Sequence, residues 1–201
     1  MPTRRDSRTR RELGFTLMEA IIVVAIIGIL LLIGMPSFLG TLNRTRLTGS
    51  AREVATLFQV ARLEAIKMNT PVKVTYDPAL RRFGAFIDQD RDGIEDAGER
   101  RLPSVVELSR KTEFRGQGEP ANGAEAIDGW DDVPAVDGPS FQFDGSVDRI
   151  GAFRLADTTG LNVIEIRVET QATGRVVQRK YDPVATKYYT HMENDQPWEW
   201  F

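Results

Sequence analysis

The sequence predicts an α+β fold in which one long N-terminal helix packs by its second half on an antiparallel β head. An apolar run at residues 15–35 passes into an amphipathic helical pattern that continues to about residue 68. Strand-like patterns follow after residue 70 without intervening helices, which favours antiparallel pairing. We therefore expect four segments: 1–14, an apolar helix half at 15–35, an amphipathic helix half at 36–70 and a β-rich head at 71–201.

The composition of the 201 residues is that of a globular chain and excludes several kinds of site. With 41% hydrophobic and 27% charged residues, the chain is too apolar for a disordered protein and too charged for a polytopic membrane protein. It has no cysteine, which excludes disulfides, thiol catalysis and zinc–thiolate sites. His191 is the single histidine, so a multi-histidine metal site is excluded too. These counts argue against a hydrolytic enzyme.

The apolar run at 15–35 predicts a membrane-spanning helix. Seventeen of its 21 residues are apolar, and at about 1.5 Å per residue it spans roughly 31 Å, the thickness of a bilayer core. Residues 1–14 hold five arginines and two acids, which predicts a cytoplasmic N-terminus and a translocated body. A plain signal-anchor and a cleaved secretory signal are alternatives, although residues 34–36 offer no small-x-small cleavage site.

Glu19 is a carboxylate inside this apolar run. At the bilayer centre such a charge costs about 3 kcal/mol, and less near the interface. A simple anchor gains nothing from it, so we expect a positive partner at the same depth. That partner has to come from another chain or from a newly made N-terminus.

The helical pattern continues beyond the membrane as an apolar stripe on one face. Asn69, Thr70 and Pro71 predict its end, because proline cannot continue the hydrogen-bond ladder, and we expect a bend near 34–36. We expect the stripe to pack on the head as core. It consists of Leu47, Ala51, Val54, Phe58, Ala61 and Ala65.

The head is predicted to hold seven strands and one long loop. Residues 163–168 and 175–181, joined by Ala172-Thr173-Gly174, predict a β-hairpin. Residues 116–139 are rich in Gly, Pro, Ala and Asp, which predicts a flexible loop. Trp130 inside it would either dock the loop on the head, the more common case, or mark a partner contact. The expected strands are 72–76, 83–88, 105–108, 141–143, 152–155, 162–168 and 175–181.

The N-terminal segment resembles the leader of type IV pilins and type II secretion pseudopilins in the string from Arg11 to Glu19, RELGFTLME. The resemblance implies cleavage between Gly14 and Phe15 by a prepilin peptidase and N-methylation of Phe15. It also implies an assembly role for Glu19, whose carboxylate would pair with the N-terminal amine of a neighbouring subunit, and a helix kink at Pro36.

The body resembles the GspH/FimT group of minor pilins. The motifs that carry this are the stretch from Ala61 to Val72, the turn from Phe86 to Glu99, and Phe141-Gln-Phe-Asp-Gly145. The resemblance implies a pilin-like fold and a structural, non-enzymatic minor pseudopilin of a type II secretion system. It further implies a single-pass protein of the inner membrane with a periplasmic head, other pseudopilins as partners and no required cofactor.

Residues 88–99 fit the calcium-loop pattern D-x-[DN]-x-[DN]-G-x5-E in full. Gly93 would supply the sharp turn of such a loop. The flanking residues predict strands rather than helices, so the alternative is a solvated hairpin loop whose Asp and Gly serve the turn. The calcium ligands would be Asp88, Asp90, Asp92, Glu99 and the carbonyl of Ile94.

The alternative function is a FimT-like minor type IV pilin that takes part in pilus assembly or DNA uptake. Its candidate nucleic-acid footprint is the basic cluster Arg175, Arg179 and Lys180, which would give weak, salt-sensitive binding. The charge argues against this alternative. Without residues 1–14 the chain holds 21 basic and 27 acidic residues, and its end carries acids and the aromatics Trp198, Trp200 and Phe201.

Overall fold

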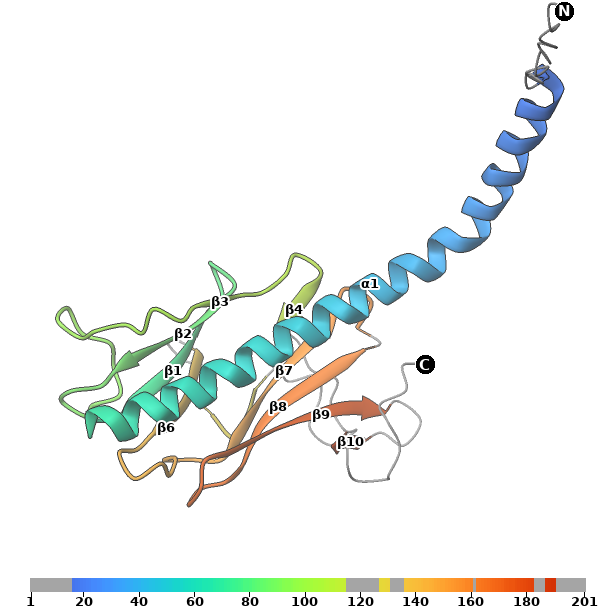
Figure 1. Cartoon of the computed structure of the whole chain (residues 1–201). Helices are drawn as coiled ribbons and strands as arrows, with labels where there is room; N and C mark the ends of the chain where they lie inside the picture. Colours follow the sequence, from blue (N-terminus) through green and yellow to red (C-terminus); the bar gives the residue numbers. More distant parts are fainter. Residues whose placement is uncertain (1–15, 115–126, 131–135, 161, 183–186, 191–201) are drawn as a thin grey trace, which may run out of the picture. The chain divides into compact units, whose positions relative to one another are not determined.

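The computed structural model describes residues 16–114, 127–130, 136–160, 162–182 and 187–190 (Figure 1). The chain divides into two compact units, Met1–Gly40 and Thr41–Phe201. One helix, α1 (Leu17–Met68), contributes to both. We call its residues 17–40 the apolar half and its residues 41–68 the head half. The predicted helix from about 15 to 68 is confirmed from Leu17 to Met68.

The apolar half has no buried side chain among its described residues. Leu17, Leu32 and Ile33 are among its most exposed residues, each with more than 70% of its surface accessible. Among the described residues, α1 is the one helix long and apolar enough to cross a membrane. The helix continues past Gly34 and Pro36, and a bend there stays a prediction.

The head half ends where its sequence stops supporting a helix. Asn69 adopts a left-handed conformation with φ 51°, and its amide donates to the Ile66 carbonyl at 3.4 Å. The Thr70 amide donates to the Ala65 carbonyl at 3.2 Å. These two bonds form a Schellman motif, which satisfies carbonyls of the last turn. Pro71 then prevents continuation, as predicted.

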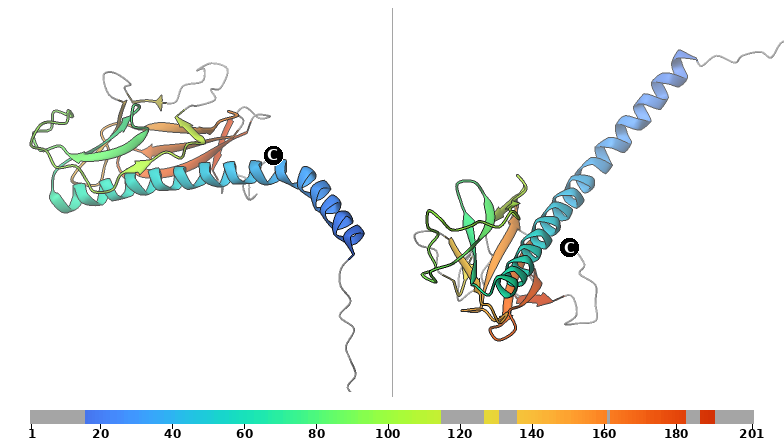
Figure 2. Two further views of the ribbon diagram at one scale, coloured as in Figure 1. Left: turned by 90° about the horizontal axis from the view of Figure 1, so that it is seen from above. Right: turned by 60° about the vertical axis from the view of Figure 1, so that its left-hand side comes forward.

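Two antiparallel sheets form the β head. The first has the order β3-β2-β1-β6, and the second has the order β10-β9-β8-β7-β4, with β5 also paired to β7. Figure 2 shows the head half of α1 lying along these sheets. The strands of the first sheet are β1 (Val72–Asp77), β2 (Arg82–Ile87), β3 (Val106–Glu107) and β6 (Val136–Phe141). Those of the second are β4 (Thr112–Phe114), β5 (Ile127–Asp128), β7 (Gly151–Asp157), β8 (Val163–Thr170), β9 (Arg175–Asp182) and β10 (Lys187–Thr190).

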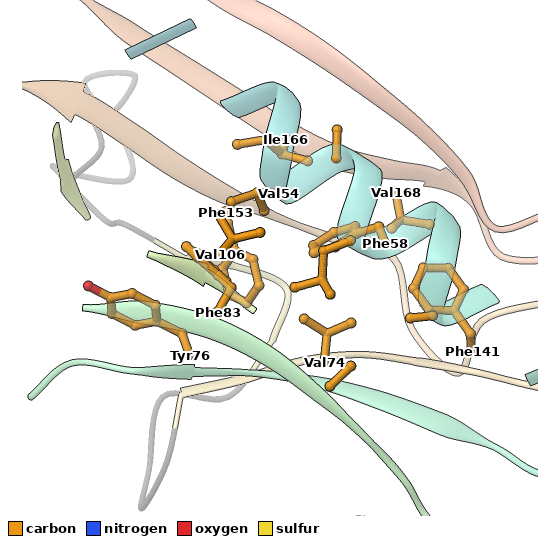
Figure 3. Close-up of a cluster of buried hydrophobic side chains, with 14 of the residues drawn as sticks. Val54, Phe58, Val74, Tyr76, Phe83, Val106, Phe141, Phe153, Ile166 and Val168 are labelled. Carbon is orange, nitrogen blue, oxygen red and sulfur yellow. The ribbon is translucent and has the colours of Figure 1, made fainter. Parts of the chain in front are cut away.

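The core lies between the head half of α1 and the two sheets (Figure 3). Phe58 is fully buried, and its ring meets those of Trp130, Phe141 and Phe153 edge to face, with centroids 5.9 to 6.1 Å apart. Such pairs contribute about 0.5–1.5 kcal/mol beyond the burial of area. All six residues of the predicted apolar stripe have no exposed surface, which confirms the stripe as core.

The prediction of residues 116–139 as one flexible loop is wrong in part. β5 lies at Ile127–Asp128 and β6 begins at Val136, while residues 116–126 and 131–135 lie outside the described residues. Trp130 is 7% exposed, and its indole Nε1 donates to the Arg149 carbonyl at 3.2 Å, so it does dock on the core. Partners distant in sequence hold these segments, because β5 pairs with β7 and β6 pairs with β1.

The prediction of a strand at 141–143 is also wrong, since β6 ends at Phe141 and a turn follows. The Asp144 carboxylate accepts from the Ser146 amide at 2.9 Å, and Gly145 has φ 82°. A side chain that caps its own turn and a left-handed glycine stop the extended backbone there. The short strands β4, β5 and β10 were not predicted.

Candidate functional site

The start of α1 carries the predicted processing and assembly residues. Gly14 and Phe15, the predicted cleavage pair, lie outside the described residues. Thr16 caps the helix, because its Oγ1 accepts from the Glu19 amide at 3.2 Å and its carbonyl accepts from the Ala20 amide at 3.2 Å. Thr16 and Glu19 also have the spacing of a capping box, S/T-x-x-E, a signal that the sequence interpretation missed.

Glu19 stands on an exposed helix surface made almost wholly of aliphatic side chains. Its neighbours Met18, Ile22 and Val23 are 44 to 68% exposed. An apolar surface of this kind marks a contact with a membrane or with another protein, because each Å² of apolar surface left in water costs about 25 cal/mol. The arrangement therefore offers one carboxylate within a surface suited to lipid or to other apolar helices.

The acidic loop at residues 88–99 is closed by backbone pairing directly outside its ends. The Ile87 amide donates to the Arg100 carbonyl at 3.0 Å, and the Leu102 amide donates to the Ala85 carbonyl at 2.8 Å. Phe86 and Arg101 form a β-bridge. The loop therefore connects two antiparallel segments, as expected from its flanking residues, and its twelve positions are held at both ends.

Carboxylates within the loop accept hydrogen bonds from backbone amides. Asp88 Oδ2 accepts from the Gly93 amide at 3.1 Å, Asp90 Oδ1 from the Asp92 amide at 3.3 Å, and Asp92 Oδ1 from the Ile94 amide at 2.7 Å. Glu99 reaches back across the loop, where its two oxygens accept from the amides of Gln89 at 2.7 Å and Asp96 at 3.2 Å. These bonds fold the loop around its own carboxylates.

Asp88 is the buried member of this loop, with 3% of its surface exposed. Burial raises the pKa of its carboxyl, and the charges of Glu99 and Asp90 add to the rise. The backbone amides of Arg91 and Gly93 lower it, but they do not compensate fully. Its Oδ1 is buried without a hydrogen-bond partner among the described residues.

The predicted calcium ligands form two overlapping groups. One ligand oxygen from each of Asp88, Asp90 and Glu99 lies within 4.8 Å of the others, and the same holds for Asp90, Asp92 and Asp96. Asp96 was not among the predicted ligands. Ile94, whose carbonyl was predicted as a ligand, directly follows Gly93, which has φ 76°.

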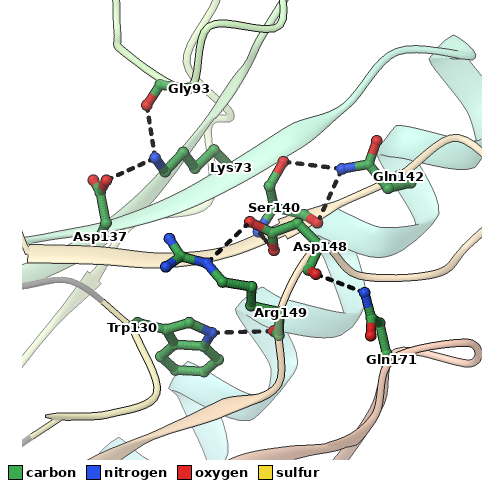
Figure 4. A network of polar contacts seen from close by, with 9 residues as sticks. All are labelled: Lys73, Gly93, Trp130, Asp137, Ser140, Gln142, Asp148, Arg149 and Gln171. Atoms are coloured by element: carbon green, nitrogen blue, oxygen red, sulfur yellow. Dashed lines mark hydrogen bonds and ion pairs between the residues drawn. The ribbon is translucent and has the colours of Figure 1, made fainter.

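Lys73 on β1 fixes the loop to the first sheet (Figure 4). Its Nζ donates to the Gly93 carbonyl and to Asp137 Oδ2, both at 2.7 Å. Only 8% of Lys73 is exposed, so these bonds operate away from bulk water, where charge-assisted contacts are strongest. A Cβ at Gly93 would lie 3.0 Å from that Nζ, and the close approach therefore favours glycine.

The predicted nucleic-acid footprint lies on β9, where both of its arginines are near Glu169. Arg179 Nη2 donates to Glu169 Oε1 at 2.8 Å, and Arg175 lies 3.8 Å from the same carboxylate. Lys180 is 8% exposed and occupies the opposite face of the strand from these arginines, because side chains alternate. The two arginines share one acid, but the Arg175 side chain is still 70% exposed, so phosphate binding by this cluster stays a prediction.

Two family models match the sequence. One, described as type II transport protein GspH, matches residues 50–174, and the other, described as the prokaryotic N-terminal methylation motif, matches residues 9–35. Pilin-like protein PilA1 of Thermus thermophilus is 38% identical over 92 residues, which are 45% of this chain. The match spans 56%, or about half, of the length of that curated relative.

Solved structures that the chain resembles include the following two. The minor pseudopilin EpsH from the type 2 secretion system of Vibrio cholerae has a TM-score of 0.46 and 13% identity, covering 74% of this chain and 99% of that one. The solution structure of E. coli GspH has a TM-score of 0.44 and 11% identity, covering 67% and 87%.

Proposed function

Because the chain belongs to the GspH family of type II transport proteins, we propose that it is a minor pseudopilin, a structural subunit of a type II secretion system. The match to the N-terminal methylation motif at residues 9–35 supports maturation of the subunit as a pilin-type protein. In this role the chain needs no catalytic residues and works by assembly. Its partners are other pilin-type subunits, and a prepilin peptidase processes it.

The division of α1 carries this proposal. The described part of the apolar half is exposed throughout, whereas the head half buries its apolar stripe in the core of the β head. The aliphatic surface of residues 17–35 therefore needs lipid before assembly and neighbouring helices after it. We place the subunit in the inner membrane, with residues 1–14 in the cytoplasm and the head in the periplasm.

Glu19 gives the assembly step its specificity in this proposal. Cleavage between Gly14 and Phe15 would create an amine four residues before Glu19. An intramembrane carboxylate is costly when alone, and a neighbour's amine at the same depth would compensate both charges. The pair would fix the register between subunits, and an uncleaved subunit would lack the amine.

The experiment compares two glutamates of the same helix in cells that carry the secretion system. Glu19→Ala is expected to abolish co-purification of the chain with other pilin-type subunits, because the intramembrane charge has no substitute. Glu53→Ala, which removes an exposed carboxylate from the head half, serves as the matched control and should leave co-purification unchanged.

Mass spectrometry of the membrane-extracted wild type tests processing in the same cells. We expect a chain that lacks residues 1–14 and carries one methyl group on Phe15. Retention of residues 1–14 without a methyl group, or assembly of Glu19→Ala at the wild-type level, would contradict the proposal.

A further inference from the structure

One carboxylate oxygen of the acidic loop is buried without a partner. Asp88 Oδ1 has no hydrogen bond among the described residues, and the residue is 3% exposed. A buried oxygen of this kind forfeits its hydration, and an ionised carboxylate forfeits more than a neutral group. The nearby amides compensate Oδ2 only, through the Gly93 bond at 3.1 Å. A positively charged ligand beside Asp88 Oδ1 would compensate this loss.

The neighbours of Asp88 place further oxygens where one cation would reach them. Ligand oxygens of Asp88, Asp90 and Glu99 lie within 4.8 Å of one another. Calcium binds oxygens at about 2.3–2.6 Å, so two ligands of one ion are at most about 5 Å apart. Three oxygens at this spacing can contact one ion together, and Asp90 links them to Asp92 in the second group.

Two positive side chains beside the loop, Lys73 and Arg101, are already engaged. Lys73 pairs with Asp137 at 2.7 Å and donates to a carbonyl of the loop. Arg101 forms an ion pair with Glu95. The loop itself holds six carboxylates and one arginine, so its acids repel one another unless a cation balances them.

The loop is also held in shape before any ion arrives. Backbone pairing between Ile87 and Arg100 fixes both ends, and Lys73 fixes the carbonyl of Gly93. Ligands that are already positioned cost less ordering entropy on binding. The structure thus provides a closed twelve-residue loop with converging oxygens.

We propose that residues 88–99 bind one calcium ion through the carboxylates of Asp88, Asp90, Asp92 and Glu99 and the carbonyl of Ile94. All of these ligands are oxygens, which suits calcium, while zinc and other softer metals prefer nitrogen or sulfur. Magnesium requires near-ideal octahedral geometry and gives up its water reluctantly, so it should bind more weakly. The proposal does not depend on the secretion function.

The test is a titration of the full chain, purified in an uncharged detergent and freed of metal, with calcium chloride in a calorimeter. We expect one ion per chain with a Kd of about 0.1–1 mM, the range of extracellular calcium modules, and a calcium-dependent rise in the Tm of the head. Magnesium chloride should give a smaller shift. No heat and no Tm shift up to about 10 mM calcium would overturn the proposal.

Three variants assign the site. Asp92→Asn and Glu99→Gln should weaken calcium binding about tenfold or more, because ligand charge sets the affinity of such loops. Asp144→Asn, which alters the turn at Ser146, is the control and should bind like the wild type. Asp92 is exposed, so its variant decides the question even if changes at buried Asp88 prevent folding. Unchanged affinity in both loop variants would overturn the assignment.

Discussion

The two halves of α1 use apolar side chains in opposite ways. The apolar half is the more hydrophobic part of the helix, yet its described side chains are exposed from Leu17 to Leu39, apart from Pro36 and Ser37, of which only the backbone is described. The head half contains more charge, yet it buries Leu47, Phe58 and Ala65 completely. Hydrophobicity alone therefore does not show which residues stabilise the head. An apolar side chain stabilises the head only where another part of the chain packs against it. Among the described residues, no part of the chain buries a side chain of the apolar half.

Truncating one phenylalanine in each half tests most directly whether only the head half stabilises the head. Phe58→Ala should cost about 3–5 kcal/mol of the free energy of unfolding of the head, because it removes a ring that packs on Trp130, Phe141 and Phe153. Phe38→Ala, at a position that is 68% exposed, should leave that free energy within about 0.5 kcal/mol.

Denaturant unfolding of the full chain in detergent, followed by tryptophan fluorescence, measures both variants. Circular dichroism before unfolding checks that each retains its helix and sheets. Equal losses in the two variants would mean that the apolar half supports the head energetically, and the division of α1 by burial would then be wrong.

A smaller effect, confined to the head, is expected from acid. Burial alone would raise the pKa of Asp157, but hydrogen bonds from Thr159 and Asn162 outweigh burial and lower it. Thr159 Oγ1 donates to Asp157 Oδ1 at 2.6 Å, and Asn162 Nδ2 donates to Oδ2 at 2.5 Å. Because the folded pKa is depressed, the contribution to stability is complete above the ordinary carboxyl value of 3.8. It is lost as pH falls through the lower folded value.

The measurement is the free energy of unfolding of the head between pH 7 and pH 2. Asp157→Asn should lower stability at neutral pH and flatten the dependence below the ordinary carboxyl pKa. Thr159→Ala removes one donor only, so its curve should lie between those of the wild type and Asp157→Asn. An Asp157→Asn curve parallel to that of the wild type would show that other carboxyls govern the acid response.

The sequence predicts the elements that depend on local pattern, and the head half of α1 is the clearest case. Helical spacing from Leu47 to Ala65, with Asn69 and Pro71 at the end, predicts both the packed face and the termination. The β8–β9 hairpin is confirmed for the same reason, because alternating residues flank a turn that ends in Gly174. In these segments the local and the tertiary preferences agree.

The segments that the sequence did not predict depend on distant partners. β5 has two residues and pairs with Phe153 and Ala152 of β7, so no local period marks it. In the acidic loop the sequence predicts the carboxylates but not the orphaned Asp88 Oδ1. That atom's lack of a partner is a feature of the folded loop, in which Lys73, 20 residues earlier in the chain, donates to the Gly93 carbonyl.

The smallest expected effect is at the N-terminal cap of the apolar half of α1. Thr16→Ala removes the oxygen that accepts the Glu19 amide at 3.2 Å, so the first turn of α1 should fray at a local cost of about 1 kcal/mol. The free energy of unfolding of the head should not change, because none of the described residues before Leu47 is buried.

Amide hydrogen exchange in detergent micelles measures that local cost, with faster exchange expected at Glu19 and Ala20. Thr16→Ser retains a hydroxyl cap and should exchange like the wild type. If Thr16→Ala also lowered the stability of the head, the two halves of α1 would be coupled along the helix. Burial would then fail as the criterion that separates a half built for assembly from a half built for folding.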